Sequence, residues 1–298
     1  MRDSWQRRID RAARLAERDE TARPLLLLYG RLLGIQRDCY EMLRQRGHRL
    51  TGSLDRDLPE LRPCVEPMLR AVAAIGPPRL ADEAGRILDG ATPAIDALLL
   101  AGWRMPGLKP RATRRSSGEQ FFPKIALQPY AECLASIGVR PRDRSGLRGS
   151  ERTGASDEAR AERSEPVGVQ GSPTIQGKYA CPFCGGAPQL SILESAGDAD
   201  GGGRQLLCAT CFTVWPFRRV LCAQCGEEDE HRLGYYHSPA FDHLRVDACD
   251  TCRHYLKTVD LTRLGIAVPV VDEVAGAPLD LWAHEHDYQK IELNLVGL

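Results

Sequence analysis

The chain has 298 residues, enough for about two globular domains that each bury a core. Lys and Arg number 40, and so do Asp and Glu, so the formal net charge is zero. This balance argues against a protein that mainly coats nucleic acid or an anionic membrane. No apolar run approaches the roughly 20 residues that span a bilayer. The twin arginine Arg7-Arg8 is followed by charge and not by the apolar segment of an export signal, so we expect a cytoplasmic protein.

Residues 1–138 are predicted to form one all-helical domain. Apolar residues recur at helical spacing in several segments, which are residues 25–43, 61–75, 80–88, 94–103 and 120–137. Joints rich in Gly and Pro, such as Gly76-Pro77-Pro78, separate several of these segments.

Residues 139–177 have a different composition. From Arg140 to Pro166 the sequence contains seven Arg and six Asp or Glu, with hardly any large apolar residues. Such a segment buries too little apolar surface to offset the entropy lost on ordering. We therefore predict a charged, flexible linker.

Residues 178–262 contain four Cys-x-x-Cys pairs. The pairs are Cys181 and Cys184, Cys208 and Cys211, Cys222 and Cys225, and Cys249 and Cys252. At this spacing one tight turn directs two thiolates at one metal ion, and two such turns complete a tetrahedral four-sulfur site. A single pair would also fit a thiol redox motif, whereas four pairs are strong evidence for metal sites.

The four pairs form an internal repeat. Between Cys184 and Cys208 lie 23 residues, and 23 again lie between Cys225 and Cys249. A glycine follows the first pair of each unit, where it suits a turn whose backbone N–H groups point at sulfur. This pattern is typical of a zinc ribbon or rubredoxin-like fold present twice.

The repeat divides the second half of the chain. We predict the first ribbon at residues 178–216 and the second at residues 217–262. A C-terminal tail over residues 263–298 is predicted to contain a strand at Ile266–Val271 and then a helix. The predicted fold class is α+β and multidomain, with an all-helical N-terminal domain followed by two small four-cysteine metal domains.

The simplest ligation is sequential, with the first four cysteines on one metal ion and the last four on another. Spacing alone leaves cross-paired ligation between the units open. Because sulfur fills every ligand position, the sites are predicted to be structural and not catalytic. Zinc and iron both fit a tetrahedral four-sulfur site, so the prediction is two ions per chain, Fe or Zn.

Other residues give weaker signals. Cys39, Cys64 and Cys133 are unpaired and lie in apolar helical contexts, which predicts buried core thiols. No catalytic triad, acid–base pair of carboxylates or phosphate loop can be placed, so we predict no enzyme activity. From Lys178 to Asp260 there are eight Lys or Arg and eleven Asp or Glu, which favours a protein partner over nucleic acid.

Aromatic and Arg residues beside the cysteine turns are the first candidates for a partner surface, because these side chains dominate interface hot spots. They are Trp215, Phe217, Arg218, Arg219, Tyr235 and Tyr236. An alternative for Trp215 and Phe217 is that they only cover the small ribbon core.

The motif set resembles the FdhE family, accessory proteins for the assembly of respiratory formate dehydrogenases. The resemblance lies in Cys181-Pro-Phe-Cys184-Gly185, Leu206-Leu207-Cys208-Ala-Thr-Cys211, Arg218-Arg219-Val220-Leu221-Cys222-Ala-Gln-Cys225-Gly226, Cys249-Asp-Thr-Cys252 and Asp280-Leu-Trp-Ala283. It covers roughly the last 120 residues, while the helical half fits the family in architecture alone.

The resemblance implies a cytoplasmic, non-enzymatic factor. It would act on the catalytic subunit of a molybdenum- or tungsten-dependent formate dehydrogenase before that subunit is exported, and it suggests iron bound as in rubredoxin. Two alternatives stay open. One is a redox protein that passes electrons through iron in its four-cysteine sites, and the other is a nucleic-acid-binding ribbon protein.

Overall fold

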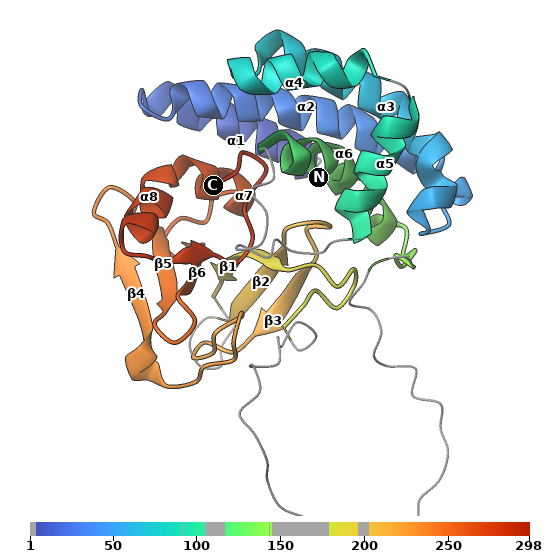
Figure 1. Ribbon diagram of the computed structural model, residues 1–298. Coiled ribbons are helices and arrows are strands. Elements are labelled where there is room, and N and C mark those ends of the chain that lie inside the picture. The colour runs from blue at the N-terminus through green and yellow to red at the C-terminus, as the bar shows by residue number, and fades with distance from the viewer. Residues whose placement is uncertain (1–3, 91, 105–116, 143, 145–178, 196–202) are drawn as a thin grey trace, which may run out of the picture.

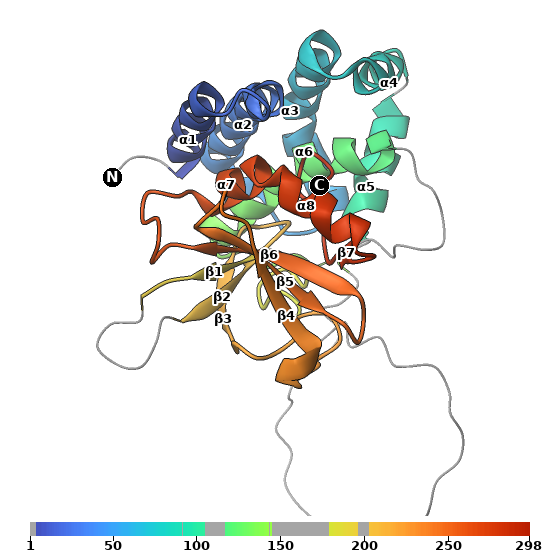
Figure 2. The ribbon, with the colours of Figure 1, turned by 90° about the vertical axis from the view of Figure 1, so that its left-hand side faces the viewer.

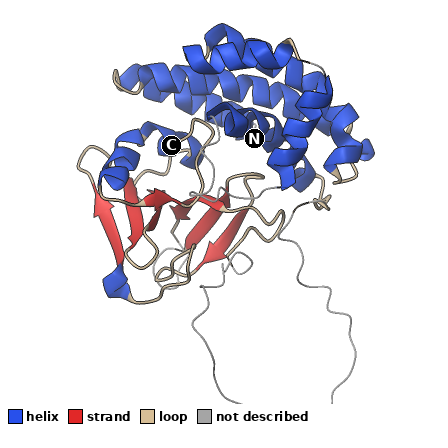
Figure 3. Ribbon diagram, viewed as in Figure 1, coloured by secondary structure: helices blue, strands red, loops and turns tan. Residues whose placement is uncertain are grey.

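The computed structural model describes residues 4–90, 92–104, 117–142, 144, 179–195 and 203–298. Most of the predicted linker, from residue 145 onward, lies outside the described residues. A layer of helices from the N-terminal half lies on a β-sheet from the C-terminal half (Figures 1 and 3). The predicted fold class, with an all-helical N-terminal part and two four-cysteine ribbons, is confirmed.

The helical layer consists of elements from the N-terminal half. They are α1 (Ser4–Arg18), α2 (Arg23–Gln45), α3 (Leu54–Ile75), α4 (Pro78–Leu88), α5 (Thr92–Arg104) and α6 (Ser117–Ser136). Helices α2 to α6 coincide with the five segments of apolar spacing. Helix α1 lacks that spacing because two of its inward-facing residues are Arg8 and Arg11, which are buried beside Trp5, Ala12 and Ala16. Among the described helices, none is both long enough and apolar enough to cross a membrane.

The strands of the two ribbons join into one sheet. They are β1 (Pro188–Leu193), β2 (Arg204–Cys208), β3 (Val214–Phe217), β4 (Leu233–His237), β5 (Leu244–Cys249), β6 (His254–Asp260) and β7 (Gln289–Lys290). The order is β3-β2-β1-β6-β5-β4, and β7 also pairs with β6. Strands β1 and β6 run parallel at the junction, with Leu190 opposite Lys257 and Leu193 opposite Asp260. The two ribbons therefore share backbone hydrogen bonds and are not separate modules.

The C-terminal segment differs from the prediction. The strand expected at Ile266–Val271 is wrong, because helix α7 occupies Pro269–Ala275. Pro269 presets the backbone of the first turn, and Val270, Val271 and Val274 then share one buried side of the helix. The predicted helix that follows is confirmed as α8 (Ala277–Glu285). Figure 2 shows that both helices lie on the face of the sheet that looks toward the helical layer.

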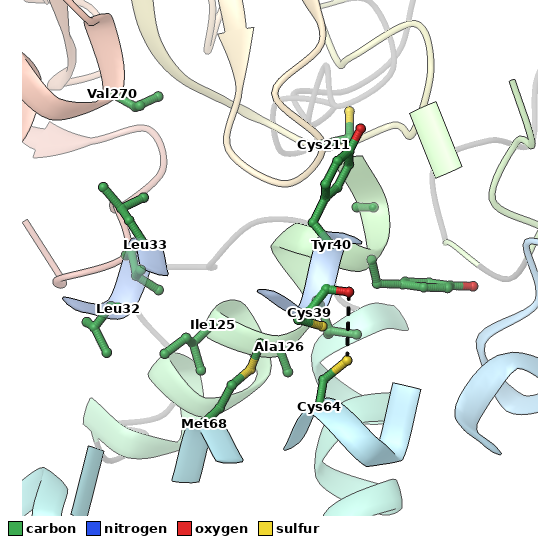
Figure 4. Close-up of a cluster of buried hydrophobic side chains, with 14 of the residues drawn as sticks. Leu32, Leu33, Cys39, Tyr40, Cys64, Met68, Ile125, Ala126, Cys211 and Val270 are labelled. Atoms are coloured by element: carbon green, nitrogen blue, oxygen red, sulfur yellow. Dashed lines mark hydrogen bonds between the residues drawn. The ribbon is translucent and has the colours of Figure 1, made fainter. Parts of the chain in front are cut away.

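The hydrophobic core continues from the helical layer into the sheet. One buried cluster contains Leu26 and Leu33 of α2 together with Leu190 and Ile192 of β1 and Val271 of α7. The three unpaired cysteines are buried in this cluster, as predicted. The Cys64 thiol lies 3.9 Å from the Cys39 carbonyl oxygen (Figure 4). Burial raises the pKa of Cys39 well above its ordinary value and that of Cys133 to about 11, so both thiols stay protonated at neutral pH.

A buried ionic cluster fixes α7 and α8 to the sheet. Lys257 of β6 lies 3.1 Å from Glu273 of α7 and also contacts Asp280 of α8. Lys290 of β7 contacts both carboxylates, and Asn294 donates a 2.9 Å hydrogen bond to Glu273. Burial by itself would raise the pKa of Glu273, but Lys257 and Lys290 lower it from 4.5 to about 2.

We expect Glu273→Gln to lower the free energy of unfolding by about 3–5 kcal/mol, because it leaves two buried lysines with one carboxylate. The folded-state pKa of Glu273 is depressed, so its contribution is complete above pH 4.5 and is lost as the pH falls toward about 2. Denaturant titrations at pH 7 and pH 3 would measure both effects. Glu228→Gln, in an exposed pair with Arg218, is the control and should change stability by less than about 1 kcal/mol. Equal effects of the two variants would contradict this account.

Candidate metal centres

The eight predicted cysteines gather into two clusters of four. Cys181, Cys184, Cys208 and Cys211 form one cluster, and Cys222, Cys225, Cys249 and Cys252 form the other. Within each cluster all sulfur atoms lie within 4.8 Å of one another. The gathering follows the sequential pairing and not the cross-paired alternative.

The spacing of the sulfur atoms suits a tetrahedral metal ion. The Sγ atoms of Cys184 and Cys208 lie 3.5 Å apart and those of Cys181 and Cys211 lie 3.6 Å apart. In the second cluster, the Cys222–Cys252 and Cys225–Cys249 distances are both 3.7 Å. Four sulfurs at about 2.3 Å from a central ion would be roughly 3.8 Å apart. A disulfide, by contrast, requires about 2.05 Å.

The glycines after the first cysteine pairs have a backbone conformation that favours glycine. Gly185 and Gly226 have φ angles of 70° and 81°, in the left-handed region. Their N–H groups donate to the carbonyls of Cys181 and Cys222, which closes each turn. In both clusters, backbone N–H groups also reach sulfur: those of Thr210 and Gln224 lie 3.4 Å from Sγ atoms.

The second turn of each cluster uses the same conformation without glycine. Phe212 and Arg253 follow Cys211 and Cys252 and have φ angles of 55° and 57°. Their N–H groups donate to the carbonyls of Cys208 and Cys249. Non-glycine residues in this region are uncommon and persist only where the surroundings enforce them. Sequence reasoning missed both residues, since neither is of a type that signals such a turn.

Protonation of the crowded thiols shows why a cation suits these clusters. Hydrogen bonds from Cys249 and Cys252 lower the pKa of Cys222 to about 4, whereas the hydrogen bond with Cys222 raises the pKa of Cys252. In the first cluster the pKa of Cys181 is likewise lowered and that of Cys211 raised by thiol hydrogen bonds. Some thiols in each cluster ionise only at the expense of others. A divalent ion would balance several thiolates at once, so the donor set fits zinc or iron.

The two clusters differ in exposure. All four cysteines of the first cluster are buried, while Cys225 and Cys252 of the second are partly exposed. The first cluster belongs to the main hydrophobic core, together with Tyr40 of α2, which Figure 4 shows with Cys211. Solvent can therefore approach the second cluster more closely than the first.

We expect purified protein to hold close to two metal ions per chain. Cys222→Ser should reduce this to about one, because each cluster has its own four ligands. Elemental analysis with a protein concentration from amino-acid analysis would measure the ratio. Cys39→Ser, which alters a buried thiol outside both clusters, should keep both ions. Loss of both ions from Cys222→Ser would indicate that the sites are strongly coupled.

The candidate partner residues lie in different environments. Tyr235 is 65 % exposed, and the Arg245 guanidinium lies 5.2 Å from its ring centre. Tyr236 is packed against Trp282, with ring centres 4.5 Å apart. Trp215 and Phe217 pack against a small buried cluster on the sheet, as their alternative interpretation predicts.

Comparisons with known proteins agree with this arrangement. Residues 180–219 match the family model "FdhE, central domain", and residues 220–296 match "FdhE, C-terminal domain". The boundary between the two matched regions falls between the two cysteine clusters. Over residues 180–296 this chain matches the FdhE family.

Curated relatives named "Protein FdhE homolog" align with a similar share of this chain. The Aquifex aeolicus homolog is 37 % identical over 120 residues, which are 40 % of this chain and 42 % of that protein. The Pseudomonas aeruginosa homolog is 30 % identical over 126 residues, 41 % of this chain and 40 % of that protein. The sequence match thus spans about two-fifths of the length of these relatives.

The fold match extends further than the sequence match. The crystal structure of the FdhE protein from Pseudomonas aeruginosa superposes with a TM-score of 0.60 at 22 % identity. It covers 99 % of this chain and 96 % of that one. The helical layer of this chain therefore has a counterpart in the known fold.

Proposed function

We propose that this protein is a cytoplasmic accessory factor for the assembly of respiratory formate dehydrogenase. It binds the catalytic subunit of that enzyme before export and carries out no reaction of its own. The observation that carries the proposal is the pair of four-sulfur clusters on one sheet, within the two regions that match FdhE domains.

The chemistry of the clusters supports a binding role. Each cluster supplies four sulfur ligands, and a tetrahedral ion bound by them has no open position for a substrate. The ligands would be Cys181, Cys184, Cys208 and Cys211 for one ion, and Cys222, Cys225, Cys249 and Cys252 for the other. The bound ions, Fe or Zn, would hold the ends of the strands and so shape the surface that meets the partner.

The exposed apolar residues of the ribbons supply candidate contacts. Val214 is 42 % exposed, Val220 is 44 % exposed and Tyr235 is 65 % exposed. Val214 lies on one edge strand of the sheet and Tyr235 on the other, so each is a separate candidate contact. Arg218 adds a charged group beside Val220, although it already pairs with Glu228 at 2.7 Å.

Capture of the enzyme tests this proposal. Tagged protein from cells that express formate dehydrogenase should retain its catalytic subunit, and Tyr235→Ala should weaken retention by roughly tenfold or more, as at an interface hot spot. Leu27→Ala is the matched control, because Leu27 is 50 % exposed but lies on α2 of the helical layer. Equal retention by both variants would exclude Tyr235 from the interface. Failure of the unaltered protein to retain the subunit would contradict the proposed partner.

Electron transfer through iron is a second candidate, favoured by the partial exposure of Cys225 and Cys252. An exposed iron–sulfur site exchanges electrons more readily than a buried one. Reversible reduction of the second site, with iron as its native metal, would support this candidate. Zinc in both sites of protein purified without oxygen would exclude it, because zinc has no redox chemistry here.

A further inference from the structure

The four residues that follow Cys208 connect the first cluster to the helical layer. This segment, Ala209 to Phe212, contains the second cysteine turn of the first cluster and is called the docking turn below. The Ala209 carbonyl accepts a 2.9 Å hydrogen bond from the side chain of Gln128 on α6. Gln128 is buried, and its own oxygen accepts a 3.1 Å bond from Gln36 of α2.

Phe212 makes the second connection. The Arg8 guanidinium of α1 contacts two rings, with its centre 4.5 Å from the centre of Phe212 and 4.5 Å from that of Trp5. Two 2.9 Å hydrogen bonds to Glu132 of α6 hold Arg8 in this position. The Phe212 and Trp5 rings meet edge to face, 6.4 Å apart. A cation over the face of an aromatic ring in a buried setting is a favourable contact.

Thr210 makes a third contact within the docking turn. Its hydroxyl lies 3.4 Å from Nη2 of Arg144, whose guanidinium lies 4.7 Å from the Trp103 ring of α5. Three of the four residues in the docking turn therefore contact groups outside the sheet. All of these contacts depend on the shape of a turn that Cys208 and Cys211 anchor.

The equivalent turn of the second cluster is Asp250 to Arg253. It contacts its own ribbon and the C-terminal segment instead of the helical layer. Asp250 accepts hydrogen bonds from Arg253 and from the Tyr288 hydroxyl. Thr251 donates to Glu227, and the Arg253 guanidinium lies 4.0 Å from the Tyr288 ring centre. The repeat thus places similar turns in different surroundings.

We propose that the ion of the first cluster is one joint between the helical layer and the sheet, in addition to the buried Arg11–Asp272 ion pair between α1 and α7, while the ion of the second cluster stabilises its own ribbon. Metal binding at the first cluster fixes the docking turn in the shape that α1 and α6 contact. Phe212 holds a left-handed backbone conformation that an unliganded turn would tend to leave. By thermodynamic linkage, docking of α1 and α6 must in turn strengthen metal binding at the first cluster. This inference rests on the proposed occupancy of the clusters by metal.

Two matched cysteine variants of the full chain test the joint. Cys184→Ser removes a ligand of the first cluster but leaves the sequence of the docking turn unchanged. Cys225→Ser is its counterpart in the repeat. Each should lose about one metal ion. Hydrogen exchange followed by mass spectrometry should show α1 amides exchanging on the order of tenfold faster in Cys184→Ser, a coupling of ordinary size. Exchange in α1 should stay unchanged in Cys225→Ser.

Two results would contradict this proposal. One is α1 amides that stay protected from exchange after the first ion is lost. The other is an equal rise in α1 exchange in both variants. If Cys184→Ser kept both ions, Cys184 would not be a ligand of the first ion. Elemental analysis therefore tests the ligand assignment separately from the coupling between the first ion and α1.

Gln128→Met decides the question if Cys184→Ser fails to fold. The substitution keeps the side-chain length and removes the donor to Ala209. In the Cys225→Ser background, where the first-cluster ion is the one left, Gln128→Met should release metal to a chelator on the order of tenfold faster. Unchanged release in the Cys225→Ser background would refute the linkage.

Discussion

Cells that lack this protein are expected to oxidise formate at less than about one tenth of the normal rate when complemented with the double variant Cys222→Ser, Cys225→Ser. Binding of a structural tetrahedral ion contributes about 10–16 kcal/mol in small metal domains, so the ribbon would lose its shape without it. The proposed partner surface includes Val220 and Tyr235 of that ribbon. Formate oxidation by intact cells would be measured together with the amount of variant protein.

The matched control alters two cysteines outside the clusters. The variant Cys39→Ala, Cys64→Ala removes two buried thiols, neither of which belongs to a four-sulfur cluster. It should restore most of the activity if its abundance is normal. Unrelated exported enzymes should keep their activity in every strain. Full formate oxidation with the double variant of the second cluster would show that this site is dispensable and would contradict the proposed function.

Removal of both ions from the full-length protein is expected to unfold the sheet. The free energy contributed by two ions would exceed the total stability of about 5–15 kcal/mol of an ordinary domain. The clusters hold strand ends, since Cys208 and Cys249 are the last residues of β2 and β5. Acidification should act in the same direction, because protons compete with the ion for thiolate sulfur and stability is therefore lost as the pH falls.

Hydrogen exchange of β2 and β5 before and after chelation would measure this effect. Amides in both strands should lose their protection, and added zinc or iron should restore it. Helix α3 (Leu54–Ile75) of the helical layer serves as the internal reference. We expect α3 to keep more protection than β2, because its contacts are with α2, α4, α5 and α6. Persistent protection of β2 and β5 in metal-free protein would show that the ions are not needed for the fold.

The sequence by itself determined the features that depend on neighbouring residues. The spacing within Cys181–Cys184 and the other pairs indicated metal turns, and the glycines at 185 and 226 have the backbone conformation that such turns require. Apolar periodicity located helices α2 to α5 because one face of each is more buried than the other, and the apolar run of α6 is buried on most of its sides. A short-range pattern of this kind is the direct result of local backbone geometry, so it can be read without the fold.

The tertiary structure alone decided how these parts combine. The parallel pairing of β1 with β6 joins two ribbons into one sheet. No local pattern in either strand indicates with which strand it pairs. The valine-rich run Ile266–Val271 suggested a strand, but its last residues belong to α7. Burial between the sheet and α1 outweighs the preference of β-branched residues for strands there. Gathering of the cysteines in sequential sets, and the burial of one cluster but not the other, likewise depend on contacts between distant residues. Such contacts are set by packing across the whole molecule, which spacing along the chain does not specify.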